Sequence, residues 1–218
     1  MPKRPVTNPT KPVTTTHLRP DRGALTFDSE GTEGGRFHSR ALHVPGLSSG
    51  LTIGRGYDMG AKNPGQITSD LVTAGVDLAL AKTVSGAATL RGENAKKFIE
   101  DNNLESFEIT ALAQKRLFEI TYATEEQSAR GVCERASTKY GACDWDKLDP
   151  AIQELIVDLK YRGDYTPHSR EVIQPLIVAN DLAGLAKAMA DQNNWKTVPT
   201  DRFNRRKAFI EAAARAKQ

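Results

Sequence analysis

Apolar positions recur at helical spacing over most of the chain after residue 20. The clearest case begins at Asp149 and Pro150, an N-cap residue followed by a first-turn proline, and ends at Gly163. Its apolar residues follow the i, i+3, i+4, i+7 spacing of one buried helix face, namely Ile152, Leu155, Ile156 and Leu159. The pattern therefore predicts a helix over residues 149–163.

Similar patterns predict the other helices. A short helix is expected over residues 21–30, with Asp21 as its N-cap and Gly31 as its stop signal. The longest helical stretch is expected over residues 109–137, and it is expected to end near Gly141. The remaining helical segments run from the Pro64-Gly65 turn signal to Val84 with a break at Gly75, and over residues 93–101, 168–179, 182–189 and 200–215.

Residues 36–58 do not follow a helical pattern. The apolar runs at residues 41–44 and 50–53 are short enough for edge strands, and residues 31–48 are rich in turn formers. The sequence therefore predicts an α+β fold that is mostly α-helical, with a small irregular β element near its N-terminus.

The length, charge and apolar content of the chain exclude several classes of function. A chain of 218 residues can form one large domain or two small lobes. The formal charge of +3 is far from the dense basic stripe of a nucleic-acid binder, so no nucleic-acid partner is expected. No apolar run approaches the roughly 18 residues of a membrane span, so no membrane span is expected either.

The first 20 residues are rich in proline and threonine and contain no apolar segment of the kind found in signal peptides. They are expected to form a disordered tail or linker, with the folded domain over residues 21–218. A protein made in the cytoplasm without a signal peptide would need another route to act outside it.

Cys133 and Cys143 are the only cysteines. Two separate reduced thiols and one disulfide are both compatible with the sequence, because Tyr140-Gly141 could turn the chain back between them. A zinc site would need further ligands at suitable spacing, and none is evident.

Candidate chemistry concentrates in residues 25–60. Glu30 and Glu33 each precede a glycine, and Thr52 and Asp58 follow on or just after a predicted strand. Either glutamate could equally be a solvated surface acid, Thr52 a plain strand residue and Asp58 a turn-capping acid. His38 and His43 could form a metal site together with Asp58. The two histidines lack a clear third ligand at suitable spacing, so neither metal nor cofactor is expected.

A glutamate at a helix end, followed by a glycine-rich segment and Thr-Ile-Gly-x-Gly, resembles the phage-type lysozymes of glycoside hydrolase family twenty-four. The pesticin-like muramidases of that superfamily are a closer match through their Ser-Gly-x-Thr-Ile-x-x-Gly-x-Asp pattern, here Ser49, Gly50, Thr52, Ile53, Gly56 and Asp58. The later segment is similar to the Trp…Pro…Arg-x-x-Arg segment of phage lysozymes, with Trp195, Pro199, Arg202 and Arg205. The resemblance covers roughly residues 22–215.

The resemblance implies a two-lobed lysozyme-like fold, with a hairpin lobe and a helical C-terminal lobe, that hydrolyses the bond between N-acetylmuramic acid and N-acetylglucosamine in peptidoglycan. Glu30 would be the general acid, while Thr52 and Asp58 would orient water or stabilise the transition state on the opposite sugar face. Arg202 would pair with the acid. Glu33 and Tyr57 are further substrate-binding or supporting candidates.

The chain departs from the phage pattern in one respect. Phage lysozymes place an aspartate between the glutamate and the threonine, whereas the only acid between Glu30 and Thr52 is Glu33. The order Glu, Thr, Asp of the pesticin-like enzymes is the one this sequence permits, and it leaves retention or inversion open.

The expected partners are peptidoglycan glycan strands, reached in the periplasm or cell wall, together with an immunity protein or a lysis or secretion apparatus. A phage endolysin and an antibacterial effector both fit. A catalytically silent glycan-binding module and a lytic transglycosylase are the alternatives.

Overall fold

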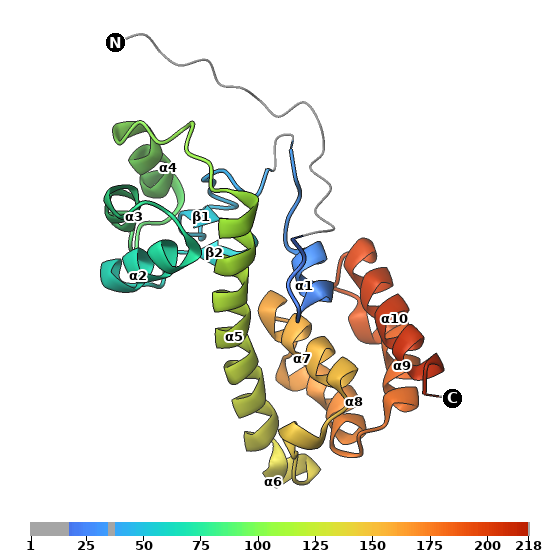
Figure 1. Ribbon diagram of the computed structural model, residues 1–218. Helices are drawn as coiled ribbons and strands as arrows, with labels where there is room; N and C mark the ends of the chain where they lie inside the picture. Colours follow the sequence, from blue (N-terminus) through green and yellow to red (C-terminus); the bar gives the residue numbers. More distant parts are fainter. Residues whose placement is uncertain (1–17, 35–37, 218) are drawn as a thin grey trace. The chain divides into compact units, whose positions relative to one another are not determined.

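The computed structural model describes residues 18–34 and 38–217. The fold is α+β and mostly helical, as predicted (Figure 1). The chain divides into two compact units. We call residues 18–21, 30–34 and 38–121 the hairpin unit, and residues 22–29 and 122–217 the helical unit. Residues 1–17, most of the predicted tail, lie outside the described residues.

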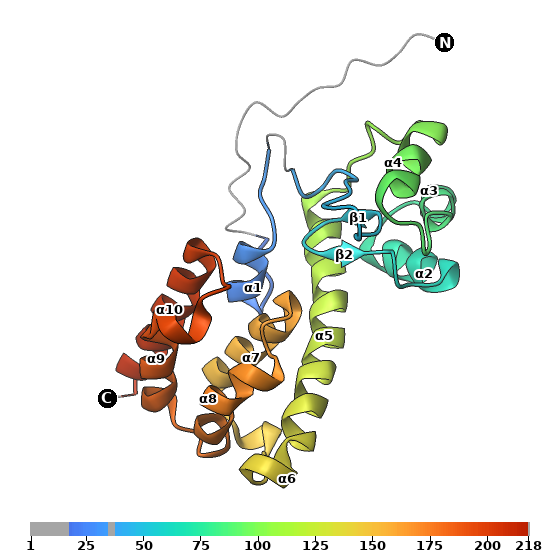
Figure 2. The same ribbon diagram turned by 180° about the vertical axis from the view of Figure 1, so that it is seen from behind.

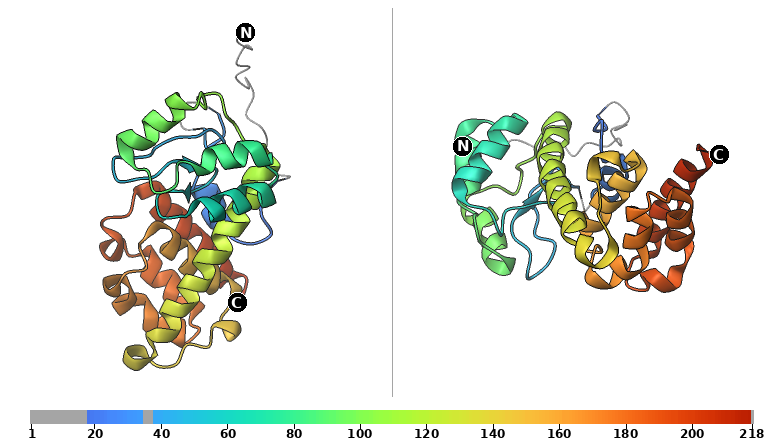
Figure 3. Two further views of the ribbon diagram at one scale, coloured as in Figure 1. Left: turned by 90° about the vertical axis from the view of Figure 1, so that its left-hand side faces the viewer. Right: turned by 90° about the horizontal axis from the view of Figure 1, so that it is seen from below.

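The hairpin unit contains two short strands and three helices, and the first part of a fourth helix. Its elements are β1 (Thr52–Ile53), β2 (Tyr57–Asp58), α2 (Pro64–Ala74), α3 (Leu78–Ser85), α4 (Gly92–Asp101) and α5 (Ala111–Arg135) as far as Thr121. Helices α2 and α3 lie side by side (Figure 3). The Pro64-Gly65 pair, predicted to form a turn, instead opens α2, because proline fits a first helical turn and Asn63 caps it.

The β element is smaller than predicted. Strands β1 and β2 form a two-stranded antiparallel sheet in which Thr52 faces Asp58 and Ile53 faces Tyr57. The expected strand over residues 41–44 is wrong as a continuous element. Residues 41 and 43 instead make isolated bridges to two different partners, Glu108 and Thr52, so no regular ladder can form.

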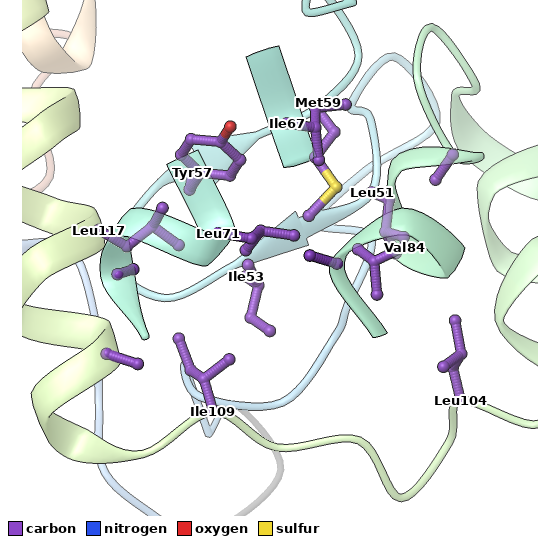
Figure 4. Packing of buried hydrophobic residues seen from close by; sticks show 14 of the residues in the cluster. Leu51, Ile53, Tyr57, Met59, Ile67, Leu71, Val84, Leu104, Ile109 and Leu117 are labelled. Carbon is purple, nitrogen blue, oxygen red and sulfur yellow. The ribbon is translucent and has the colours of Figure 1, made fainter. Parts of the chain in front are cut away.

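One face of this sheet is buried in the core of the hairpin unit. Leu51, Ile53, Tyr57 and Met59 are at most 1% exposed and point toward apolar residues of α2, α3 and α5 (Figure 4). Successive side chains along a strand point to opposite faces. The intervening residues of the hairpin are therefore directed away from this core.

The helical unit consists of helices from both ends of the chain. Its elements are α1 (Ala24–Ser29), the remainder of α5, α6 (Ser137–Tyr140), η2 (Trp145–Lys147), α7 (Pro150–Arg162), α8 (Pro167–Val178), α9 (Leu182–Ala190), η3 (Gln192–Trp195) and α10 (Thr200–Arg215). Helix α1 packs against α7 and α10, and α9 packs against α8 and α10 (Figure 2).

Helix α7 confirms the clearest sequence prediction. The Asp149 side chain accepts a hydrogen bond from the backbone N–H of Ala151, and Gly163 ends the helix. The long helix predicted over residues 109–137 is present as α5 and ends at Arg135. The start of α1 differs from the prediction: the helix begins at Ala24 rather than Asp21, because Gly23 has a φ of +77°, outside the helical region.

Cys133 and Cys143 form a disulfide with a Cα–Cα distance of 6.2 Å, so the structure adopts the second of the two alternatives left open by the sequence. The bridge joins α5 to the segment after α6. Among the described residues, no helix combines the length and apolar character needed to cross a membrane.

Candidate active site

Thr52 and Asp58 are six residues apart in sequence and directly opposite each other across the hairpin. The backbone N–H of Met59 donates to the carbonyl oxygen of Leu51 at 2.9 Å, which makes Thr52 and Asp58 a pair without hydrogen bonds between their own backbones. In such pairs the Cα atoms are about 4.5 Å apart and the side chains lie on one face. The hairpin therefore brings these two candidates together on the face opposite the core.

The Asp58 carboxylate is held by two backbone N–H groups. Its Oδ2 accepts from Gly50 at 3.2 Å and its Oδ1 accepts from Gly60 at 2.6 Å. This close approach requires glycine at position 50, because a Cβ there would lie 2.2 Å from the backbone nitrogen of Gly60. The partly exposed carboxylate is thus fixed, and each oxygen still has a lone pair for a further hydrogen bond.

Thr52 is buried, and its hydroxyl donates to the carbonyl oxygen of Gly50 at 3.1 Å. A hydroxyl has one proton to donate and two lone pairs with which to accept. Because the proton is already used within the hairpin, Thr52 is prepared to accept a hydrogen bond from a water molecule or a sugar hydroxyl.

Glu30 directly follows α1, and the chain is fixed on both sides of it. In the helical unit, Arg202 Nη2 donates to the carbonyl oxygen of Ser29 at 3.0 Å. In the hairpin unit, Arg55 Nη1 donates to the carbonyl oxygen of Gly31 at 2.9 Å. Glu30 itself is partly exposed. The carbonyl groups of the two residues that flank Glu30 are therefore each held by an arginine of their own unit.

Arg202 has a second function in the helical unit. Its Nη1 lies 3.3 Å from Asp158 Oδ1, and the side chain is largely buried. The predicted pairing of Arg202 with Glu30 stays a prediction, whereas its contacts with Asp158 and with the end of α1 are part of the fold.

Glu33, the competing acid, lies at the centre of a partly buried ion-pair cluster. Gln114 Nε2 donates to Glu33 Oε1 at 2.6 Å, and Arg55 Nη2 lies 3.3 Å from the same oxygen. Arg40 Nε lies 3.0 Å from Oε2. All three of these groups are donors, so they favour the ionised carboxylate, which only accepts. This arrangement favours a structural role for Glu33 and leaves Glu30 as the better candidate for a general acid.

His38 and Glu108 complete the Glu33 cluster. His38 Nε2 lies 2.9 Å from Glu108 Oε1, while His38 Nδ1 accepts from the backbone N–H of Gly34 at 2.8 Å. Arg40 Nη2 also lies 2.9 Å from Glu108 Oε1. The sequence reasoning missed Arg40, Arg55 and Gln114, because these partners come from separate segments and no local motif links them. Across residues 18–34 and 38–217, no group of three or more His, Cys, Asp or Glu side chains is arranged to hold a metal ion.

Tyr57 faces the core rather than the candidate site. It is 1% exposed, and its hydroxyl donates to Asp70 Oδ2 at 2.7 Å. Burial, reinforced by the neighbouring Asp70 carboxylate, raises the pKa of Tyr57. Of the two roles expected for Tyr57, substrate binding or support, its buried position favours support, because its place on β2 alternates with that of Asp58.

One family model matches most of the chain. Residues 23–207 match the family described as a domain of unknown function, DUF8812. The chain belongs to this family. No curated protein matches it. The matched region includes Glu30, the hairpin with Thr52 and Asp58, and Arg202, and since the family description gives no activity, a functional assignment has to rest on the chemistry of these residues.

Proposed function

We propose that this member of the family is a muramidase that hydrolyses the bond between N-acetylmuramic acid and N-acetylglucosamine in bacterial peptidoglycan. The observation that carries the proposal is the placement of Thr52 directly opposite Asp58 on the face of the hairpin that points away from the core. These are the two residues, besides Glu30, that the pesticin-like resemblance assigns to catalysis.

Each residue supplies a group that the reaction needs. Hydrolysis of a glycosidic bond requires an acid that protonates the leaving oxygen and a second group that activates water or stabilises the oxocarbenium ion. Glu30 acts as the acid. Thr52 accepts a hydrogen bond from the attacking water, because its own proton is bound by the carbonyl oxygen of Gly50. Asp58 offsets positive charge on the sugar, with its carboxylate fixed by two backbone N–H groups.

The cellular setting belongs to the same proposal. The protein acts on glycan strands in the periplasm or cell wall, as a phage endolysin or an antibacterial effector. An immunity protein or a lysis or secretion apparatus is the expected protein partner.

Glu30→Gln and Glu33→Gln form the matched pair of variants that tests the assignment of the acid. Glu30→Gln should lower the release of fragments from purified peptidoglycan by about 10²–10⁴-fold, the usual contribution of a general acid, with little change in melting temperature. Glu33→Gln should keep activity per folded molecule, because its carboxylate binds other side chains of the hairpin unit. An active Glu30→Gln beside a folded but inactive Glu33→Gln would reverse the assignment.

Mass analysis of the released fragments tests the reaction itself. Fragments that end in reducing muramic acid are expected. Anhydro ends would identify a lytic transglycosylase, and reducing glucosamine ends would exclude both. Binding to peptidoglycan without release of any fragment would identify a glycan-binding module and overturn the proposal.

A further inference from the structure

The hairpin face that carries Thr52 and Asp58 contains a third polar residue, His43. The backbones of His43 and Thr52 exchange two hydrogen bonds, from His43 N–H to Thr52 O at 3.0 Å and from Thr52 N–H to His43 O at 2.8 Å. Residues opposite each other in an antiparallel pair present their side chains to the same face. Leu42 and Val44 pack against the core cluster, so alternation also directs His43 away from it.

The three residues form a row in which Thr52 is the middle member. The Cα atoms of a hydrogen-bonded antiparallel pair, such as His43 and Thr52, are about 5.5 Å apart. Those of a pair without hydrogen bonds, such as Thr52 and Asp58, are about 4.5 Å apart. A water molecule bound to the Thr52 hydroxyl would therefore have an imidazole on one side and a carboxylate on the other.

The hydrogen bonds of His43 define which ring nitrogen can accept a proton. Nδ1 lies 3.0 Å from the carbonyl oxygen of Ala41, and because a carbonyl only accepts, Nδ1 is the protonated donor. The neutral ring then carries its acceptor lone pair on Nε2. Among the residues that the structure describes, none forms a hydrogen bond with this Nε2. His38 is different, because both of its ring nitrogens are engaged within the Glu33 cluster.

Asp58 is less suited than His43 to take a proton. Both oxygens of its carboxylate already accept backbone N–H groups, from Gly50 and Gly60. These bonds fix the carboxylate and leave it suited to offset positive charge. The partly exposed imidazole of His43 has a basic nitrogen without such a partner.

We propose that His43 is the proton acceptor of this row, a role that rests on the muramidase activity proposed above. The oxygen of the attacking water bonds to the anomeric carbon, and one of its protons passes to His43 Nε2. The glycosidic C–O bond breaks, its electron pair stays on the leaving oxygen, and that oxygen takes the proton of Glu30. The proton on His43 then passes to solvent, and Glu30 regains one from solvent.

Two variants of His43 separate proton acceptance from other roles. His43→Asn keeps an amide N–H that can donate to the Ala41 carbonyl oxygen but removes the basic nitrogen. It should lower kcat by about 10²–10⁴-fold, with KM unchanged within about two-fold. His43→Gln provides an amide oxygen that accepts hydrogen bonds without being basic, so it should be as impaired as His43→Asn. The matched control is His168→Asn on α8, at a histidine whose side chain is 86% exposed; it should retain full activity.

The pH profile provides a second readout that a structural role would not change. A proton acceptor acts only while its lone pair is free, so a rate that depends on such a group should decrease on the acid side of the wild-type pH profile. His43→Asn should lose this acid limb. Asp58 and Glu108, carboxylates on the segments that pair with this one, are present in both proteins.

The outcomes distinguish this proposal from the assignment of the enzyme class. An active wild-type protein together with fully active His43→Asn, or with activity restored in His43→Gln, overturns the role of His43 and leaves the muramidase proposal intact. A wild-type protein that releases no fragments overturns both. Melting temperatures show whether the variants fold; if neither folds, the ring is a structural element and the proposal fails.

Discussion

Each compact unit contains a cluster of arginines and carboxylates, and the two clusters are closed to water to different degrees. In the helical unit, Arg206 Nε lies 2.6 Å from Asp158 Oδ2, and both side chains are 0% exposed. In the hairpin unit, the Glu33 side chain is 9% exposed and Glu108 is 35% exposed. The Asp158–Arg206 pair at the centre of the helical cluster is thus sealed from water, and this cluster reaches the surface at its edge through Asp164 and Arg162. The hairpin cluster reaches the surface through Glu108.

The two clusters also hold different kinds of structure together. In the helical unit, Asp158 of α7 binds Arg202 and Arg206 of α10, so the ion pairs join two regular helices. In the hairpin unit, Arg40 and Arg55 bind Glu33, and all three residues lie outside the helices and strands. Side-chain ion pairs therefore hold an irregular region together in one unit and join two regular helices in the other.

The largest effect on the free energy of unfolding is expected from breaking the sealed centre of the helical cluster. Asp158→Asn removes the carboxylate charge beside Arg202 and Arg206, both largely buried, and should lower the free energy of unfolding by about 3–5 kcal/mol. Urea denaturation measures this loss. The control is Glu93→Gln on α4, whose pair with Lys96 is exposed and should contribute no more than about 1 kcal/mol. A loss for Asp158→Asn no greater than for this control would contradict the comparison.

A smaller effect is expected in the hairpin unit. Glu33→Gln should lower the free energy of unfolding by about 1–3 kcal/mol, because the amide keeps one acceptor oxygen but loses the charge beside Arg40 and Arg55. Urea denaturation under the same conditions gives the value. Hydrogen exchange should show the loss of protection within residues 31–34, 38–40 and 54–56, and unchanged protection there would argue against a role of Glu33 in holding these segments.

The smallest effect on the free energy of unfolding is expected at acid pH, from Asp164 at the edge of the helical cluster. Burial alone would raise the pKa of Asp164, but hydrogen bonds from Arg162 and Arg206 outweigh it and leave the pKa below its usual value. As the pH falls below about 4, the unfolded carboxyl binds a proton before the folded one does, so stability decreases. Asp164→Asn should show a shallower decrease over this acid range in urea denaturation. An identical slope in both proteins would rule out the contribution of Asp164.

Local sequence patterns determined most of the helices. The helix over residues 200–215 has the predicted bounds, and α7 has its predicted N-cap at Asp149 and its end at Gly163. Periodic apolar residues, caps and glycine stops act between residues close in the chain, so the sequence displays them directly. The candidates Thr52 and Asp58 could also be chosen from the sequence, through the resemblance of the surrounding motif.

Contacts between residues far apart in the chain decided the questions that the sequence left open. The preference for Glu30 over Glu33 gains support only once Arg40, Arg55 and Gln114 are seen around Glu33, and Gln114 is 81 residues away from it in the chain. The choice between the two roles expected for Tyr57 depended on its inward direction, which follows from the register of the hairpin. The disulfide of Cys133 and Cys143 likewise depended on the path of the chain between them.

By itself, the sequence determined the fold class, the helices and the stretch in which the candidate chemistry lies, because these depend on interactions between near neighbours. Only the tertiary structure decided that His43, Thr52 and Asp58 share one row and that Glu33 is enclosed by donors. The physical reason is that strand register and buried ion pairs join segments far apart in the chain, and their partners become defined only when those segments pack together.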